Sequence, residues 1–219
     1  MGPQKRNQGG SVLLFMATIK NIIFDLGGVL LNIDYNKTSE AFKNLGIKNF
    51  DELFSQFKAD ELFEKLETGN ITEDNFYQSI QKYSKLPLEV TDIKAAWNMM
   101  LLDFRKDSIS FLESISDKYN LFLLSNTNSI HYTAFQKILQ EETGKHELEE
   151  YFKKSYYSHL IKMRKPYPAT YNFVLNDSSL IAKETLFIDD SINNIEAAKK
   201  LGILTYHLLP EERIEKINL

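Results

Sequence analysis

The chain has 219 residues, of which 43% are hydrophobic and 26% are charged, so it has the composition of a folded globular protein and not of a disordered one. The 26 basic and 30 acidic residues leave a net charge of -4, which offers no global positive field to nucleic acid or to an anionic membrane. The chain has no cysteine, which excludes disulfides, thiolate metal sites and a cysteine nucleophile and fits the cytoplasmic location that we expect.

The first residues carry no sign of a membrane anchor. The longest apolar run near the start, residues 12–17, is far shorter than the ~20 residues of a membrane-spanning helix. We expect residues 1–15 to be a flexible leader or a segment foreign to the native protein. Residues 20–25 then read as a buried strand, because residues 22–24 are continuously apolar, and the glycine pair at 27–28 ends it.

A long helical stretch follows this strand. From residue 36 to residue 98, apolar residues recur at intervals of three and four, which is typical of helices packed on one face. Residues 68–70 and Pro87 interrupt the pattern, and Thr72 starts the next helix with capping chemistry. The sequence therefore predicts an all-helical insertion, which we place at residues 34–103.

After Phe104 the pattern alternates between helices and strands. We predict helices at 106–118, 129–143, 167–175 and 193–201, and strands at 121–124, near Tyr156, at 185–188 and at 203–206. Five strands alternating with helices indicate an α/β fold with a doubly wound parallel sheet. Residues 16–33 and 104–219 would form this Rossmann-like core, and the insertion would be a helical cap over its ligand crevice.

Polar side chains follow several of the predicted strands, where sheets of this type bind ligands. They are Asp25, Ser125, Lys165, Asp189 and Asp190. Two carboxylates 4 Å apart repel each other by ~4 kcal/mol at an effective dielectric of 20. A divalent cation relieves such repulsion, and a ligand set of oxygen atoms favours Mg²⁺.

This set of residues also has a chemical logic. A metal ion and Lys165 can hold a phosphate dianion against Asp25. The Asp25 carboxylate can then attack phosphorus to form an aspartyl-phosphate, which water hydrolyses. Ser125 and the backbone N–H groups after it suit the remaining phosphate oxygens.

Four motifs resemble the haloacid dehalogenase superfamily, and in particular its phosphatase branch. They occur in the family's order: IIFDLGGVL at 22–30, LLSNTN at 123–128, RKP at 164–166, and FIDDS at 187–191 followed by 194–198. The details are most similar to bacterial sugar-phosphate phosphatases of the glucose-1-phosphate type. They are also similar to the phosphatase domain found beside epoxide hydrolases.

The resemblance implies a role for each matching residue. Asp25 would be the nucleophile and a Mg²⁺ ligand, the backbone carbonyl of Gly27 a second ligand, and Asp190 the main acidic ligand of the fourth motif. Asp189 would be a nearby ligand or would support one.

Further residues would bind the phosphate and the substrate. Ser125 and Asn126 would hold phosphate, Lys165 would neutralise Asp25 and phosphate, and Gly27 and Gly28 would line the phosphate site. A loop at the position of Glu67 faces the site in similar caps, so Glu67 is a candidate specificity residue.

One departure from the family pattern concerns proton transfer. Most phosphatases of this superfamily carry a second aspartate two residues after the nucleophile, as general acid and base, but here that residue is Gly27. The enzyme would then rely on good leaving groups or on water, or another group would substitute, with His131 and Asp34 as candidates. Lys162, where relatives often have glycine, is a second departure.

We therefore expect a Mg²⁺-dependent phosphomonoester hydrolase that acts on a small phosphorylated metabolite such as a sugar phosphate. We expect no nucleic-acid or membrane partner and a monomer or homodimer. Two alternatives stay open. One is a metal-independent haloacid dehalogenase, which the acidic pair Asp189 and Asp190 disfavours. The other is a phosphometabolite-binding module whose catalysis is weakened at Gly27.

Overall fold

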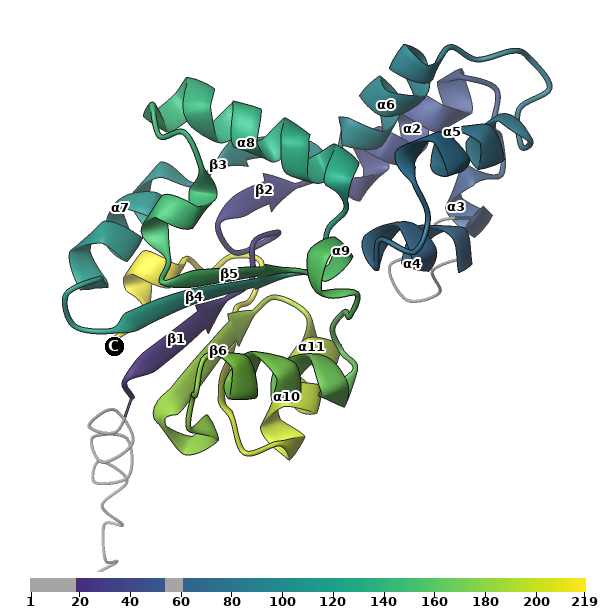
Figure 1. Ribbon diagram of the computed structural model, residues 1–219. Coiled ribbons are helices and arrows are strands. Elements are labelled where there is room, and N and C mark those ends of the chain that lie inside the picture. The colour runs from purple at the N-terminus through teal and green to yellow at the C-terminus, as the bar shows by residue number, and fades with distance from the viewer. Residues whose placement is uncertain (1–18, 54–60) are drawn as a thin grey trace, which may run out of the picture.

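The computed structural model describes residues 19–53 and 61–219, so the leader expected at residues 1–15 lies outside the described residues. A parallel sheet of five strands runs through the molecule in the order β5-β4-β1-β6-β7 (Figure 1). The strands are β1 (Asn21–Phe24), β4 (Asn120–Ser125), β5 (Lys154–Tyr157), β6 (Thr185–Asp189) and β7 (Leu204–His207). The predicted α/β fold with a doubly wound parallel sheet is confirmed.

The central strand β1 is buried along its whole length, which explains its continuous apolar run. Phe24 pairs with Leu123 of β4 on one side and with Ile188 of β6 on the other. The backbone N–H of Asp25 donates to the carbonyl of Ile188 at 2.9 Å, which extends this register by one residue. The carboxyl ends of three neighbouring strands therefore meet at the same edge.

Helices cover both faces of the sheet (Figure 1). Side chains alternate along β1, so Ile22 packs into one apolar cluster and Ile23 into another. Helices α7 (Lys106–Ile115) and α8 (Ser129–Thr143) belong to the first cluster, and α10 (Pro168–Asp177) and α11 (Ile192–Lys200) belong to the second. Short α9 (Ser158–Ile161) follows β5, and single 3-10 turns lie at Leu148–Tyr151, Ala182–Glu184 and Ile214–Lys216.

A small antiparallel pair of strands differs from the prediction. Strands β2 (Leu31–Ile33) and β3 (Leu101–Phe104) pair with each other, with Leu31 opposite Phe104. Such short segments show no periodicity of their own, and each is a strand because the other lies beside it. The two strands carry the chain from the sheet to the inserted helices and back again.

The inserted helices are α2 (Tyr35–Asn44), α3 (Phe50–Leu53), α4 (Glu61–Glu67), α5 (Glu73–Gln81) and α6 (Val90–Asn98), which we call the cap helices. Their apolar residues form a third cluster, which Ile130 at the start of α8 joins from the core. The rings of Phe63 and Trp97 stack at 5.3 Å between centroids, and Phe76 packs against both. Thr72 caps α5 by accepting the N–H of Asn75, as predicted.

Among the described residues, none of the helices combines the length and the apolar character that crossing a membrane requires.

Candidate active site

A cavity of about 400 Å³ lies between the carboxyl ends of the strands and the cap helices. Its sheet side is lined by the residues that the sequence predicted for the site: Asp25, Gly27, Ser125, Asn126, Lys165 and Asp190. Its cap side is lined by residues that include Tyr35, Phe63, Glu64, Glu67 and Trp97. The structure therefore brings residues from four separate motifs together with the predicted cap residue Glu67.

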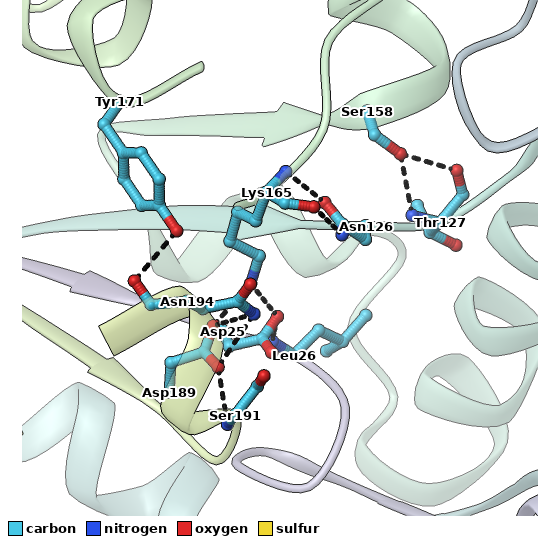
Figure 2. Close-up of polar contacts among 10 residues, drawn as sticks. All are labelled: Asp25, Leu26, Asn126, Thr127, Ser158, Lys165, Tyr171, Asp189, Ser191 and Asn194. Atoms are coloured by element: carbon cyan, nitrogen blue, oxygen red, sulfur yellow. Dashed lines mark hydrogen bonds and ion pairs between the residues drawn. The ribbon is translucent and has the colours of Figure 1, made fainter. Parts of the chain in front are cut away.

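Lys165 lies between two aspartates at the base of this cavity (Figure 2). Its Nζ atom is 2.7 Å from Oδ1 of Asp25 and 2.7 Å from Oδ2 of Asp189. Burial disfavours the ammonium form, but the two carboxylates outweigh that cost and raise the pKa of Lys165. The lysine is therefore a fixed positive charge held against the predicted nucleophile.

Asp189 is fully buried and is surrounded by protein donors (Figure 2). Its Oδ1 accepts the backbone N–H of Ser191 at 2.8 Å and the amide of Asn194 at 3.0 Å. Its Oδ2 accepts Lys165 and a second bond from Asn194. These contacts favour a role for Asp189 in holding Lys165 in place, whereas Asp190 lines the cavity.

The three aspartates form one acidic cluster. Asp25, Asp189 and Asp190 each offer a carboxylate oxygen within 4.8 Å of the others. Burial is the main cause that raises the pKa of Asp25, and the charges of Asp189 and Asp190 raise it further. Lys165 has the opposite effect but does not outweigh them. Burial and Asp189 raise the pKa of Asp190 in the same way. The three carboxylates outnumber the one lysine, and their oxygen atoms are the ligands that a hard divalent cation such as Mg²⁺ prefers.

The two glycines after β1 allow this close packing. Gly28 has a φ of +72°, and a Cβ atom on it would lie 2.2 Å from Oδ2 of Asp190, so no larger residue fits without moving that carboxylate. A Cβ atom on Gly27 would lie 2.6 Å from Cδ1 of Ile33. A larger residue at position 27 would therefore have to displace the end of the Ile33 side chain.

The predicted phosphate-binding residues divide into two kinds. Ser125 is buried at the end of β4 and lines the cavity. The amide of Asn126 is already engaged, because its Oδ1 accepts the N–H of Lys165 and its Nδ2 donates to the carbonyl of Lys165, both at 2.9 Å. The contacts therefore assign Asn126 to joining the two loops. Ser158, which the sequence analysis missed, holds both backbone groups of Thr127 in the same loop (Figure 2).

The structure argues against both residues proposed to replace the missing aspartate. His131 lines the cavity, but its Nε2 donates to the carbonyl of Trp97 at 3.0 Å and its Nδ1 accepts the amide of Asn128 at 3.1 Å. Burial lowers the pKa of His131 to about 4, so the ring stays neutral. Asp34 caps helix α2 by accepting the N–H of Asn36 and is not among the cavity-lining residues.

Glu67 ends helix α4 and reaches across the cavity to the core. Its Oε2 lies 3.2 Å from the guanidinium group of Arg164, the residue before Lys165, and both side chains are largely buried. Burial raises the pKa of Glu67, and Arg164 opposes this effect. Arg164 is a cavity residue for which the sequence analysis gave no role beyond its motif.

The loop after Glu67 also touches the core. Lys162 adopts a left-handed conformation with φ of 59°, and its Nζ donates to the backbone carbonyl of Gly69. A Cβ atom on Gly69 would lie 2.3 Å from the carbonyl of His159, so only glycine allows this approach. The positive charge of Lys162 is thus directed at the cap loop.

The chain belongs to the haloacid dehalogenase-like hydrolases, because the sequence model of that hydrolase family matches residues 19–202. Among characterised proteins, it is 32% identical over 188 residues to a D-ribitol-5-phosphate phosphatase of Bacteroides thetaiotaomicron. This alignment covers 86% of this chain and 91% of that protein. It is also 27% identical over 195 residues to a sesquiterpene phosphatase of Aspergillus oryzae, covering 87% and 90% of the two chains.

Solved structures give the same result. A haloacid dehalogenase family enzyme of Bacteroides thetaiotaomicron, an aspartate-to-alanine variant in complex with magnesium and inorganic phosphate, superposes with a TM-score of 0.85 at 37% identity over 90% of this chain and 96% of its own. A predicted hydrolase of this family from Porphyromonas gingivalis has a TM-score of 0.81 at 30% identity over 89% and 93%. The predicted family and the prediction that the chain is a phosphatase are confirmed.

Proposed function

We propose that this phosphatase hydrolyses the phosphomonoester of a small metabolite with Mg²⁺, through an aspartyl-phosphate on Asp25. The observation that carries the proposal is the position of Lys165, whose ammonium group lies 2.7 Å from both Asp25 and Asp189 while Asp190 completes the acidic cluster. A fixed positive charge beside a buried carboxylate suits the capture and transfer of a phosphoryl dianion.

The chain's own residues account for the two chemical steps. Oδ1 of Asp25 is held by Lys165 and by the N–H of Leu26 at 2.7 Å, so we assign the attack to Oδ2. In the first step a bond forms between this oxygen and phosphorus while the bond to the substrate oxygen breaks, and that oxygen gains a proton. In the second step water attacks phosphorus and releases Asp25.

Asp25, Asp190 and the backbone carbonyl of Gly27 would hold the Mg²⁺ ion, as the family resemblance implies. When bound, the ion offsets the negative charge that gathers on the phosphoryl group. Ser125 would bind the phosphate oxygens from the end of β4.

The proposed substrate is a sugar phosphate or polyol phosphate. The cavity of about 400 Å³ is the size of a small ligand, and its cap side carries Glu64 and Glu67 beside Arg164. Such charged groups can bind the hydroxyl groups of a sugar or polyol better than they can bind an apolar substrate chain. A relative that acts on D-ribitol 5-phosphate supports the same class.

We also propose that residues 34–103 act as a cap over the core formed by residues 16–33 and 104–219. The apolar cluster of the cap helices is distinct from the two clusters on the faces of the sheet, although Ile130 of α8 packs into it, and this supports the division. The monomer or homodimer, the absence of nucleic-acid and membrane partners and the cytoplasmic location stay predictions.

The test measures hydrolysis of 4-nitrophenyl phosphate and of a panel of sugar and polyol phosphates by wild type and Asp25→Asn. Activity that requires both Mg²⁺ and Asp25 is the expected result. Asp34→Asn is the matched control, because Asp34 caps α2 outside the cavity and asparagine caps helices equally well.

Three outcomes contradict the proposal. Hydrolysis that persists in Asp25→Asn removes the aspartyl-phosphate. Halide release from a 2-haloacid in the presence of a chelator, without phosphatase activity, favours the dehalogenase alternative. Binding of inorganic phosphate without turnover of any ester favours the binding module.

A further inference from the structure

This inference concerns the size of the substrate, and it rests on the proposed function. A second cavity, of about 500 Å³, lies at the junction of the cap and the core. Glu64, Arg164 and Tyr167 line both this cavity and the active-site cavity. A residue that lines two cavities lies at their boundary, so the two cavities meet at these three residues, which we call the dividing wall.

Two contacts between the cap and the core hold the dividing wall together. The hydroxyl of Tyr167 donates to Oε1 of Glu64 at 3.1 Å. On the side of the active-site cavity, the guanidinium group of Arg164 lies 3.2 Å from Oε2 of Glu67. Helix α4 supplies both glutamates and lies beside α9, whereas Arg164 and Tyr167 come from the loop after α9 (Figure 1). The wall is therefore formed where the cap meets the core.

Tyr167 is attached to a well-held turn. Its backbone N–H donates to the carbonyl of Arg164 at 3.2 Å, and the hydroxyl of Thr170 donates to the same carbonyl at 2.6 Å. The turn contains Lys165, whose backbone is bonded to the amide of Asn126 in both directions. None of these bonds uses the side chain of Tyr167, which is 52% exposed. That side chain can therefore be shortened while the fold and the position of Lys165 are kept.

The second cavity is polar and reaches the surface of the molecule. Lys65, Asn70 and Lys162 line it and are exposed to solvent. Thr68 and Thr170 add hydroxyl groups to its lining. Hydroxyl groups of a ligand can donate to or accept from side chains of these kinds, so the space suits a second sugar unit better than an apolar chain.

We propose that Tyr167, held by Glu64, sets the upper limit on the size of the substrate. With its phosphate beside Asp25, a monosaccharide or polyol phosphate fits within the active-site cavity, whereas a longer substrate meets the ring of Tyr167. Removal of this side chain joins the two cavities, and a disaccharide phosphate then extends into the second one. Tyr167 is thus a specificity-determining residue that takes no part in the transfer of the phosphoryl group.

The test compares wild type and Tyr167→Ala on two esters. The long ester is trehalose 6-phosphate, and the short ester is the monosaccharide or polyol phosphate that the wild type hydrolyses fastest. The measured quantity is kcat/KM for the long ester divided by kcat/KM for the short one, because a change in the shared catalytic groups cancels in this ratio. We expect Tyr167→Ala to raise the ratio by at least about tenfold, since differences in pocket contacts discriminate between substrates by such factors.

Tyr83→Ala is the matched control. Tyr83 is a tyrosine of the cap with 39% exposure, and it is not among the residues that line either cavity. We expect this variant to keep the wild-type ratio. Tyr167→Phe keeps the ring and loses only the bond to Glu64, so we expect its ratio to rise less than that of Tyr167→Ala.

The inference is overturned if the ratio in Tyr167→Ala does not exceed the wild-type ratio, because the ring then does not limit the substrate. A wild type that hydrolyses the long ester as efficiently as the short one overturns it too, as does an equal rise of the ratio in Tyr83→Ala. A wild type without Asp25-dependent activity on any ester overturns the proposed function itself.

Discussion

Lys165 and Asp189 form an ion pair of 2.7 Å in which neither side chain is more than 1% exposed to solvent. Because Asp25 is the second carboxylate on the same ammonium group, the pair couples the predicted nucleophile to strand β6. The stability of the fold and the chemistry of the site therefore depend on the same buried charges.

Lys165→Met is expected to lower the free energy of unfolding by about 3–5 kcal/mol when a chelator is present, because buried carboxylates lose their counter-charge. Adding Asp189→Asn should recover at least about 1 kcal/mol of that loss, since one unpaired charge is then removed. Urea denaturation measures both values. Lys20→Met is the control, because its pair with Glu184 lies at the surface and contributes less than about 1 kcal/mol. The coupling is contradicted if Lys165→Met loses as little unfolding free energy as Lys20→Met. It is also contradicted if the losses of Lys165→Met and Asp189→Asn simply add in the double variant.

Gly28→Ala is expected to weaken Mg²⁺ activation by at least about tenfold, which corresponds to ~1.4 kcal/mol, because the new Cβ atom displaces the carboxylate of Asp190. Titration of activity with Mg²⁺ measures the effect. Gly202→Ala is a matched control, since Gly202 has a similar φ of +78° but no atom within 4 Å of the added carbon. Both variants should lose about 1 kcal/mol of stability from backbone strain. Equal Mg²⁺ activation in the two variants would show that the contact with Asp190 is unimportant.

His131 is expected to make stability depend on pH. Its pKa is about 4 in the fold and near 6.5 when unfolded, so the unfolded chain binds more protons between these values. The contribution of His131 to the free energy of unfolding is fully present above pH 6.5. It falls by about 3 kcal/mol as the pH drops to 4.

The measurement is the difference in unfolding free energy between wild type and His131→Gln at several pH values. Burial lowers the pKa of His159 to about 4 as well, but His159 is present in both proteins and its effect cancels. Parallel pH profiles for the two proteins would contradict a buried neutral His131.

Glu67→Gln is expected to reduce discrimination among substrates. We expect kcat/KM for a polyol phosphate to fall by about tenfold relative to 4-nitrophenyl phosphate, because a hydrogen bond from a hydroxyl to a charged group contributes about 1.5–3 kcal/mol. Glu73→Gln is the control, since Glu73 lies on α5, accepts from Tyr77 and is not among the cavity-lining residues. An equal fall for both esters would place Glu67 outside substrate recognition.

Much of the fold follows from local patterns. The apolar run of β1 and the repeating helix patterns after Phe104 are properties of neighbouring residues, so the five parallel strands and their helices were predictable. Strands β2 and β3 were not, because Leu31 and Phe104 are far apart in the sequence and each segment is a strand only beside the other.

The sheet side of the site was predictable for a related reason. The carboxyl ends of parallel strands meet at one edge, so Asp25, Ser125, Asp189 and Asp190 had to lie near one another once the strands were recognised. The bonds that divide their roles were not, because the amides of Asn126 and Asn194 find partners only when distant loops meet.

The family, the four motifs at the strand ends and the acidic residues with their lysine can be read from the sequence, because they depend on short motifs and on local periodicity. The residues that face them from the cap cannot be read in the same way. How the cap helices pack on the core depends on contacts between residues far apart in the chain, such as Glu67 with Arg164. For that reason the place of Tyr35, at the start of α2, in the lining of the cavity became visible only in the structure.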